Sequence, residues 1–274
     1  MADTRGGSIR RSIALVGYGA MGGYVHRALA GDTNLHISHV VVPPDCIDDT
    51  RARLRGDAVV VGDVDHIDKQ PDFALECAGH VAVAQAVPKL LRRGVDVIVA
   101  SVGALGKAGV PDLLEAAARQ GGAQLTLVPG AIAGVDALAA ARQQGLVSVQ
   151  YMGRKPPAGW RGTPAEHSID LDALKEAAVF FEGTAREASA LYPKNANVAA
   201  MTGLAGIGLD RTRVVLIADP AITRNTHRIV ACGDFGELDI RTASETLPDN
   251  PKTSMLAALS IVRAVRNRVA TVVI

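Results

Sequence analysis

The feature that most constrains this chain is the alternation, in its first half, of short β-branched runs with longer segments rich in alanine and leucine. Helical patterns separate several of these runs, and Pro111 near the start of one suits the first turn of a helix. Such alternation predicts a doubly wound α/β fold, in which crossover helices cover both faces of a parallel sheet. The predicted strands are Ile13–Val16, His36–Val42, Val59–Val61, Ala74–Cys77, Val95–Ala100 and Leu125–Val128.

The second half of the chain changes character, because several of its predicted strands follow one another at the spacing of hairpins. Gly233, Asp234 and Gly236 supply the turn between the last two strands, which indicates a mixed or antiparallel sheet. The predicted strands are Leu146–Tyr151, Ala178–Phe181, Val214–Ala218, His227–Cys232 and Leu238–Thr242, and helices over Ala185–Leu191 and Asn197–Leu204 are expected to cover one face.

The last segment returns to a helical period, with apolar residues on one stripe at Met255, Leu259, Val262, Val265 and Val269. We expect this helix to dock on the first domain. The predicted organisation is therefore a dinucleotide-binding domain over residues 1–129, completed by a C-terminal helical segment over 250–274, and a second α/β domain over 130–249.

A glycine motif lies at the first predicted strand–helix turn. Gly17, Gly19 and Gly22 have the G-x-G-x-x-G spacing and directly follow the run Ile13–Val16, while Ala20 and Met21 open the helical pattern. The glycines permit a tight turn, close approach of a pyrophosphate and close helix–strand packing. The anion would bind the N–H groups of the helix N-terminus. In this context the motif predicts dinucleotide binding.

The choice between NAD and NADP stays open in the sequence. Many NAD-selective sites carry an acid at the end of the second strand to bind the ribose 2′-hydroxyl. Here that strand ends in Val42 followed by two prolines, and the first acid is Asp45; Arg51 and Arg53 lie further along. We therefore expect use of NAD or NADP.

Residues that follow two further predicted strands are also candidates for binding the dinucleotide. Ligands of open α/β sheets bind outside the carboxyl ends of the strands, so residues at these ends are expected to face the cofactor. The alternative is that the glycines there are ordinary turns between strand and helix. The residues concerned are Ala78, Gly79 and His80 after the fourth strand, and Ser101 and Gly103 after the fifth.

Composition excludes several other classes of protein. Lys+Arg 29 against Asp+Glu 28, with aromatic residues at 3%, argue against a nucleic-acid partner. The cysteines, Cys46, Cys77 and Cys232, lack Cys-x-x-Cys spacing, so we expect no disulfide framework and no metal. Because no apolar run approaches the ~20 residues of a membrane span, we expect no membrane partner and a cytoplasmic protein.

His227 is the best candidate among the chain's histidines for a catalytic group. A substrate held above a nicotinamide needs a base from the second domain, and His227 lies at the start of a strand there, two residues after Asn225. The alternative is a packed or exposed histidine without a catalytic role. The polar segments 192–198 and 250–254 are ambiguous in the same way, because their side chains are suited either to helix capping or to ligand binding.

Taken together, these motifs resemble the L-aspartate dehydrogenase family, over nearly the whole chain. The second-domain motifs are more specific than the glycine motif. The resemblance rests on Gly17–Gly22, Pro129–Gly134, Tyr151–Pro156, Glu182–Glu187, Tyr192–Asn197, Ala218–Pro220, Asn225–His227 and Asn250–Ser254.

The resemblance implies a Rossmann domain joined to an α/β catalytic domain, usually in a homodimer. It implies oxidation of L-aspartate with NAD(P) to iminoaspartate, which hydrolyses to oxaloacetate and ammonia or feeds NAD biosynthesis. The family's active-site histidine falls on His227, and its cofactor-contacting alanine and asparagine fall on Ala131 and Asn197. The lead-in Pro129-Gly130 varies among relatives, which leaves the path of that loop open.

The two carboxylates of aspartate need cationic or N–H partners. Our candidates are Lys194, Lys252, Thr253 and Ser254, with Arg154 and Lys155 as alternatives. A histidine can take the proton of the substrate amine or activate the water that hydrolyses the imine, and the sequence does not separate these roles.

Other readings compete with this one. The glycine motif combined with a mixed-sheet domain also fits a homoserine-dehydrogenase-like or a dihydrodipicolinate-reductase-like oxidoreductase. A protein of a different class, which senses NAD(P) without turnover, would share the first domain.

Overall fold

The computed structural model describes residues 10–193, 195, 197–248 and 250–273, without the side chains of residues 251 and 252. The chain forms two compact units. Unit 1 holds the residues up to Val99, Leu114–Thr126 and the residues from Val262 onward, and unit 2 holds Ala100–Leu113 and Leu127–Ile261. The domain boundaries expected from the sequence stay a prediction, because a division by compactness does not test which segments act together.

The sheet of unit 1 has the strand order β3-β2-β1-β4-β5-β6. The pairs β1–β2, β1–β4, β2–β3 and β4–β5 are parallel, which confirms the predicted parallel sheet and the Rossmann architecture. The strand order reverses direction between β1 and β4, so the crevice outside their carboxyl ends is the expected ligand site. The strands are β1 (Arg11–Val16), β2 (Leu35–Val41), β3 (Val59–Val61), β4 (Phe73–Glu76), β5 (Asp96–Val99) and β6 (Leu125–Leu127).

Helices connect these strands because each parallel pair needs a crossover. Both faces of the sheet are covered, so its central strands are apolar throughout, and Ile13, Leu15, Leu75 and Ile98 are fully buried. The connecting helices are α1 (Ala20–Leu29), α2 (Ile47–Arg53), α3 (His80–Arg92) and α4 (Val110–Gly121), with short 3-10 turns η1 (Pro44–Cys46), η2 (Val64–His66) and η3 (Val102–Gly106).

The sheet of unit 2 is mixed, as expected, with the order β11-β10-β7-β9-β8. β7 and β9 are parallel, and the other neighbours are antiparallel. The hairpin between β10 and β11 turns through residues 233–236, where the sequence predicted it. The strands are β7 (Leu146–Lys155), β8 (Ala178–Thr184), β9 (Arg213–Ala218), β10 (Asn225–Gly233) and β11 (Gly236–Ser244).

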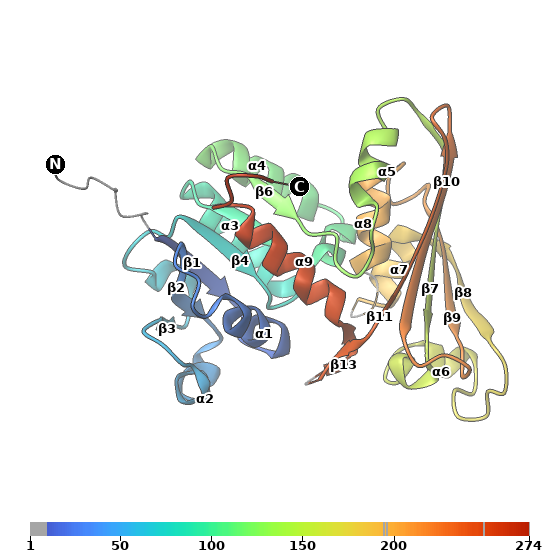
Figure 1. The fold of residues 1–274 in the computed structure, drawn as a ribbon, viewed down its shortest axis with the longest axis horizontal. Helices are drawn as coiled ribbons and strands as arrows, with labels where there is room; N and C mark the ends of the chain where they lie inside the picture. Colours follow the sequence, from blue (N-terminus) through green and yellow to red (C-terminus); the bar gives the residue numbers. More distant parts are fainter. Residues whose placement is uncertain (1–9, 194, 196, 249, 274) are drawn as a thin grey trace. The chain divides into compact units, whose positions relative to one another are not determined.

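Figure 1 shows three helices along one face of this sheet: α5 (Val135–Ala141), α7 (Ala185–Leu191) and α8 (Asn197–Ala205). The hydrophobic core of unit 2 lies between these helices and the sheet, and it includes Val149, Leu138, Ala199, Leu216 and Ile229. α7 begins at a capping box, in which Thr184 and Glu187 bond each other's backbone N–H.

The remaining elements of unit 2 are short: η4 (Pro157–Trp160), α6 (Ala165–Ser168), β12 (Thr246–Leu247) and β13 (Asn250–Ser254). The last helix, α9 (Met255–Arg266), contributes residues to both units. Its predicted apolar stripe is partly wrong. Leu259 is 44% exposed, whereas Ala258, Ile261, Val262 and Val265 are buried, because the buried face is centred one residue away from the predicted stripe.

Candidate active site

The glycine motif forms the turn between β1 and α1. Gly17 has φ +94°, and a Cβ there would lie 2.7 Å from the backbone of Ala78. A Cβ at Gly22 would lie 2.2 Å from the carbonyl oxygen of Gly17, so α1 can approach β1 this closely only with glycine at that position. The sequence predicted this tight turn and this close packing for the two glycines.

The N-terminus of α1 is open to an anion. Gly19 precedes the helix without a side-chain cap, and the first turn, which includes Ala20 and Met21, carries no acidic residue. A Cβ built at Gly19 would meet nothing within 4 Å. The N–H groups of a first helical turn have no partner within the helix, and the helix dipole favours a negative charge beside them.

The end of β4 lies beside this turn. The buried carboxylate of Glu76 accepts hydrogen bonds from the N–H groups of Ala78 and Gly79, at 2.8 and 2.7 Å, and these bonds fix the backbone between β4 and α3. His80 is the first residue of α3. The structure therefore brings together the predicted cofactor residues that lie in unit 1.

A cavity of about 610 Å³ opens at the carboxyl ends of β1 and β2, next to α3. Its lining is largely apolar and includes Val41, Pro43, Ala78 and Val81, which suits an adenine ring. Asp63, at its edge, is paired with Lys89 at 3.0 Å. Asp45 is not among the residues that line this cavity.

The residues of unit 1 thus fit a dinucleotide. A glycine turn, an uncapped helix N-terminus and an apolar cavity follow one another at the carboxyl edge of a parallel sheet, which is the arrangement that such cofactors use.

In unit 2, polar side chains gather on the buried face of the sheet. Tyr151, Gly153 and Lys155 alternate along β7, and Asn225 and His227 alternate along the neighbouring strand β10. The tyrosine, lysine, asparagine and histidine side chains belong to residues no more than 4% exposed. Buried polar groups in such number call for a functional or hydrogen-bonding explanation.

Tyr151 and His227 form the centre of this cluster. The phenol oxygen lies 2.7 Å from Nδ1 of His227, and the two rings are nearly parallel, at 16°. Gly153 lies directly opposite His227 in the β7–β10 register. A Cβ at Gly153 would lie 2.7 Å from the phenol oxygen, so the absence of a side chain there makes room for the contact.

His227 is electrically neutral in this environment. Burial, with a further contribution from the Lys155 charge, lowers the pKa of His227 to about 3. Burial also raises the pKa of Tyr151, which keeps the phenol protonated. Nε2 of His227 is shielded from solvent and has no hydrogen-bond partner in the part of the chain that the structure describes.

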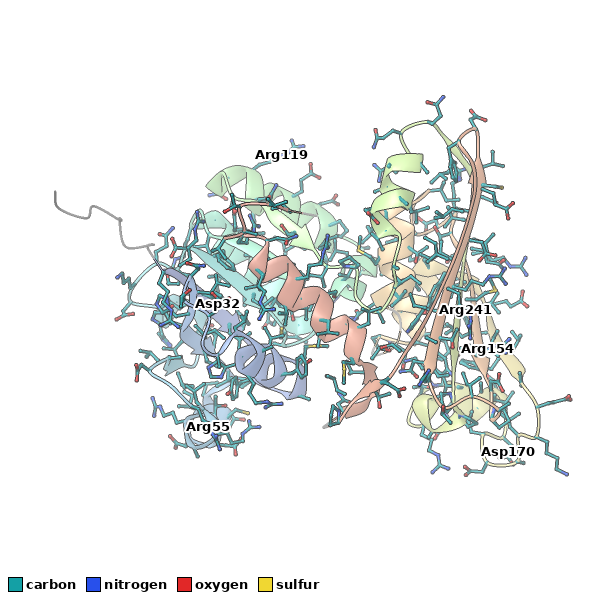
Figure 2. All side chains as sticks on the ribbon, in the orientation of Figure 1. Asp32, Arg55, Arg119, Arg154, Asp170 and Arg241 are labelled. Carbon is teal, nitrogen blue, oxygen red and sulfur yellow. The ribbon has the colours of Figure 1, made fainter. Side chains whose placement is uncertain are left out.

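Lys155 brings a positive charge to the same cluster. Its Nζ donates to Oδ1 of Asn195 at 2.6 Å and lies 5.0 Å from the centre of the Trp160 ring. Arg154, labelled in Figure 2, is the next residue along β7 and so lies on the opposite face from Lys155, and it donates to Asp219 at 2.9 Å. Of the two alternatives in this motif, the lysine is the one beside His227.

Other predicted residues of unit 2 have contacts of their own. Oδ1 of Asn197 accepts the N–H of Gly103 at 2.9 Å, within unit 2. The carbonyl of Ala131 accepts from Thr242 at 2.9 Å, and Thr242 lies opposite His227 on β11. Ser101 is buried at the end of β5.

The structure describes the side chains of only some of the predicted substrate residues. Oγ of Ser254 accepts from Nδ2 of Asn225 at 3.3 Å, two residues before His227, and Thr253 precedes it in β13, half-buried. Lys194 lies outside the described residues, as does the side chain of Lys252.

The roles of Tyr151 and Gly153 were missed at the sequence level. Both lie in a motif that carries the family resemblance, and their alternation with Lys155 has the period of a strand. The sequence nevertheless gives no register between β7 and β10, and the register is what brings the tyrosine to His227.

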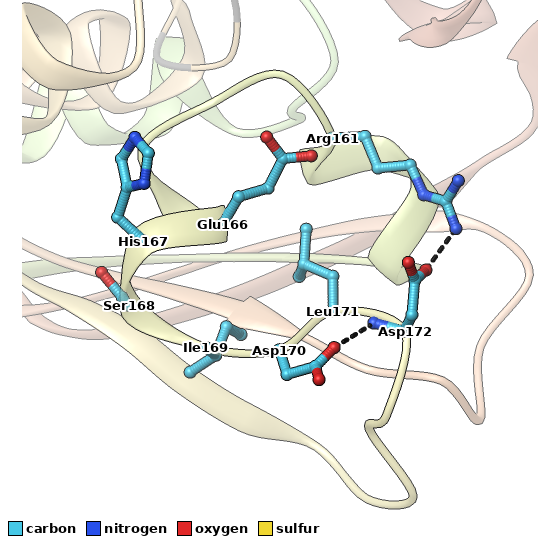
Figure 3. Close-up of a pocket in the computed structure, with 8 residues that line it drawn as sticks. All are labelled: Arg161, Glu166, His167, Ser168, Ile169, Asp170, Leu171 and Asp172. Atoms are coloured by element: carbon cyan, nitrogen blue, oxygen red, sulfur yellow. Dashed lines mark hydrogen bonds and ion pairs between the residues drawn. The ribbon is translucent and has the colours of Figure 1, made fainter.

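A second cavity lies in the loop that contains α6 and has a volume of about 550 Å³. Figure 3 shows its charged lining, in which Arg161 is paired with Asp172. None of the predicted site residues lines it. Among the described residues, no group of three or more His, Cys, Asp or Glu side chains could hold a metal ion, and no helix is long and apolar enough to cross a membrane.

The dinucleotide-binding sheet and the mixed sheet with its buried histidine define a class: the NAD(P)-dependent oxidoreductases with a Rossmann fold. Residues 17–127 match the NAD-binding domain family of homoserine dehydrogenase, and residues 136–268 match the C-terminal family of aspartate dehydrogenase. L-aspartate dehydrogenase of Cupriavidus necator is 49% identical over 257 residues, which cover 93% of this chain and 97% of the relative. The Pseudomonas aeruginosa enzyme of that name is 46% identical, with the same coverage.

Solved structures agree at the level of the fold. Aspartate dehydrogenase from Thermotoga maritima matches with a TM-score of 0.76 and 23% identity, over 97% of this chain and 99% of that one. A hyperthermophilic archaeal homoserine dehydrogenase in complex with NADPH has a TM-score of 0.60, 11% identity and coverages of 94% and 97%. By its sequence relatives, the chain belongs to the L-aspartate dehydrogenase family.

Proposed function

We propose that this protein oxidises L-aspartate with NAD or NADP to iminoaspartate, which hydrolyses to oxaloacetate and ammonia. The observation that carries the proposal is the buried, unpartnered Nε2 of a neutral histidine beside a buried lysine, among the residues described. An orphaned polar atom at such a position is explained by a ligand that supplies its partner. Membership of the L-aspartate dehydrogenase family supports aspartate as that ligand.

The cofactor would be held chiefly by the glycine turn. Gly17, Gly19, Ala20, Met21 and Gly22 would bind the pyrophosphate through backbone N–H groups. When bound, the oxidised cofactor accepts the hydride that leaves Cα of aspartate. The further residues proposed to contact it are Ala78, Gly79, His80, Ser101, Gly103, Ala131 and Asn197.

The substrate would be held by the polar cluster of unit 2. Aspartate carries two carboxylates, and each needs donors in a site from which water is excluded. Lys155 supplies a buried ammonium group and His227 an imidazole. Thr253 and Ser254 offer hydroxyls, and that of Ser254 accepts from Asn225, two residues before His227. Lys194 and Lys252 complete the set of candidates.

His227 is the proposed catalytic residue. Hydride leaves Cα readily only when the amine is neutral and its lone pair can form the C=N bond. A neutral imidazole next to the substrate can orient it, exchange a proton with it, or orient the water that later attacks the imine.

The substitution His227→Ala tests this assignment. We expect kcat for aspartate oxidation to fall about 100-fold or more, because the imidazole that contacts the substrate is lost, with little change in the Kd of NAD(P). The measurement is the absorbance of reduced cofactor, with His167→Ala, an exposed histidine in α6, as the matched control.

A homoserine preference would contradict the proposal. Wild-type protein that reduces NAD(P)+ with homoserine and not with aspartate is a homoserine-dehydrogenase-like enzyme. Protein that binds the cofactor but turns over neither substrate is a sensor of NAD(P).

We also propose a homodimer located in the cytoplasm whose iminoaspartate feeds NAD biosynthesis. The homodimer and the link to NAD biosynthesis rest on the family resemblance, and the location rests on the expectation from the sequence. Sedimentation equilibrium decides the oligomeric state.

A further inference from the structure

The proposed reaction assigns no role to the hydroxyl of Tyr151. The residue is 1% exposed, and its phenol oxygen has one hydrogen-bond partner among the described residues, Nδ1 of His227. Because one hydroxyl hydrogen is shared with one ring nitrogen, the direction of this bond decides which nitrogen of His227 carries the proton.

Two arrangements are compatible with the 2.7 Å distance. In the first, Nδ1–H donates to the phenol oxygen, and the phenol hydrogen must then find another acceptor. The hydroxyl has no second hydrogen-bond partner among the described residues, and the position beside it that a side chain would fill at residue 153 is left empty by Gly153. In the second, the phenol donates to the lone pair of Nδ1, and the one group left without a partner among the described residues is Nε2–H, which a bound acceptor would complete. The first arrangement leaves two buried groups without partners, the phenol hydrogen and the Nε2 lone pair, whereas the second leaves only Nε2–H, so the second is favoured by about tenfold.

A doubly protonated ring does not compete with these two. Burial and the nearby ammonium group of Lys155 both disfavour the imidazolium form, as the lowered pKa of His227 records. The neutral ring therefore carries one proton, and Tyr151 determines its position.

We propose that Tyr151 is a positioning residue that holds His227 as the Nε2–H tautomer, so that Nε2–H and the Lys155 ammonium group together bind one carboxylate of the substrate. The identity of that substrate rests on the proposed function, whereas the tautomer is inferred from the hydrogen bond between Tyr151 and His227.

A carboxylate is the acceptor that fits these two donors. The amine nitrogen of aspartate must keep its lone pair for the forming C=N bond, so a hydrogen bond donated to it would oppose hydride loss. A carboxylate oxygen accepts such a bond without that penalty, and it also neutralises the lysine charge. The two donors lie on the same face of neighbouring strands, since Lys155 is two residues beyond Gly153, the residue opposite His227.

Nitrogen NMR on the full chain saturated with NAD+ tests the tautomer directly. The shifts of the two ring nitrogens distinguish a protonated from an unprotonated site, and the signal of His227 is the one lost in His227→Ala. We expect a protonated Nε2 and an unprotonated, hydrogen-bonded Nδ1. A protonated Nδ1 with a bare Nε2 would overturn the proposal, whether or not any variant folds.

Succinate then identifies the acceptor, because it has two carboxylates and no amine. We expect its binding to shift the Nε2 proton resonance of His227, and a bound succinate that leaves this resonance unmoved would overturn the carboxylate subsite.

The variant Tyr151→Phe completes the test. We expect a mixture of tautomers at His227 and a KM for aspartate raised about tenfold, with a smaller change in kcat and an unchanged Kd for NAD+. The control Tyr24→Phe removes a phenol hydroxyl from α1 and should alter none of these.

Failure of the two proposals is distinguishable. If wild-type protein oxidises aspartate but Nε2 is bare, the tautomer assignment is wrong and the proposed function stands. If it does not oxidise aspartate, the function fails whatever the spectrum shows.

Discussion

A single imidazole carries most of the chemistry inferred for unit 2, and its surroundings decide its charge. His227 is 3% exposed and lies near the charge of Lys155, so both desolvation and repulsion oppose its protonation. A dicarboxylate bound beside it would offset the lysine charge. We therefore expect the pKa of His227 to rise when the substrate binds.

The same burial links His227 to the pH dependence of stability. Its pKa falls from 6.5 in the unfolded chain to about 3 in the folded one. Between these values the unfolded state binds the extra proton, so the free energy of unfolding decreases as the pH falls through this window and is fully retained above it. From pH 7 to pH 5 the loss due to His227 is about 2 kcal/mol.

Urea unfolding of wild type and His227→Gln at pH 7 and pH 5 measures this contribution. All other titrating groups are shared, so the variant should lose about 2 kcal/mol less than wild type over that interval. His167→Gln, at an exposed position, should follow wild type. Equal losses in wild type and His227→Gln would mean that His227 titrates normally in the folded protein.

At the scale of elements, β7 organises the site. It pairs with β10 on one side and β9 on the other, and it presents Tyr151, Gly153 and Lys155 to the buried face. The hydrophobic pattern predicted this strand only as far as Tyr151. Gly153, Arg154 and Lys155 have low strand preference, and they are extended because both neighbouring strands bond to them.

The substitution Gly153→Ala tests this organisation. Its Cβ would lie 2.7 Å from the phenol oxygen of Tyr151 and 3.2 Å from Leu216, so we expect a loss of about 1–3 kcal/mol in unfolding free energy and a lower rate of aspartate oxidation. In the control Gly23→Ala, the new Cβ meets only the flexible end of Arg27, at 3.4 Å, and the helix should gain about 0.5–1 kcal/mol. A Gly153→Ala protein as stable as wild type would contradict the close packing described here.

Elements with a strong pattern were predictable, and elements defined by their neighbours were not. The runs that became β1 to β6 are apolar because both faces of their sheet are covered, and the sequence located all of them. α2, α5 and α6, of seven residues or fewer, were not predicted. The segment 250–254 was interpreted as a cap or a ligand-binding segment, but it is strand β13, whose pairing with β12 a local pattern does not reveal.

The residues of the candidate site also fall into those that the sequence predicted and those that it did not. His227, Ala131 and Asn197 followed from position and motif resemblance, and the structure adds their contacts. The dyad of Tyr151 and His227 joins residues 76 positions apart and depends on the register of β7 and β10, which no local sequence signal fixes.

At the scale of the whole molecule, the site proposed for the cofactor's adenosine half and the site proposed for the substrate belong to different units. The apolar cavity at the end of β2 lies in unit 1, and the cluster around His227 lies in unit 2. A change at the cavity should therefore alter cofactor choice and leave the KM for aspartate unchanged.

The substitution Pro43→Asp tests whether the cavity determines cofactor choice. It adds a carboxylate at the exposed edge of the cavity, where it can accept from a ribose hydroxyl but repels a 2′-phosphate. We expect kcat/KM with NADP+ to fall about tenfold or more relative to NAD+. Pro164→Asp adds the same charge in unit 2 and should leave the ratio as it is. An unchanged ratio in Pro43→Asp would place the ribose elsewhere.

The way the chain is divided between the units has a consequence for its biosynthesis. Unit 1 is built from separate stretches, and its last stretch begins at Val262, where Arg268 bonds Asp96 and Thr126 and Arg266 bonds the carbonyl of Ala28. All strands of the parallel sheet are synthesised before these arginines. During synthesis, the parallel sheet therefore lacks these contacts until unit 2 has been made.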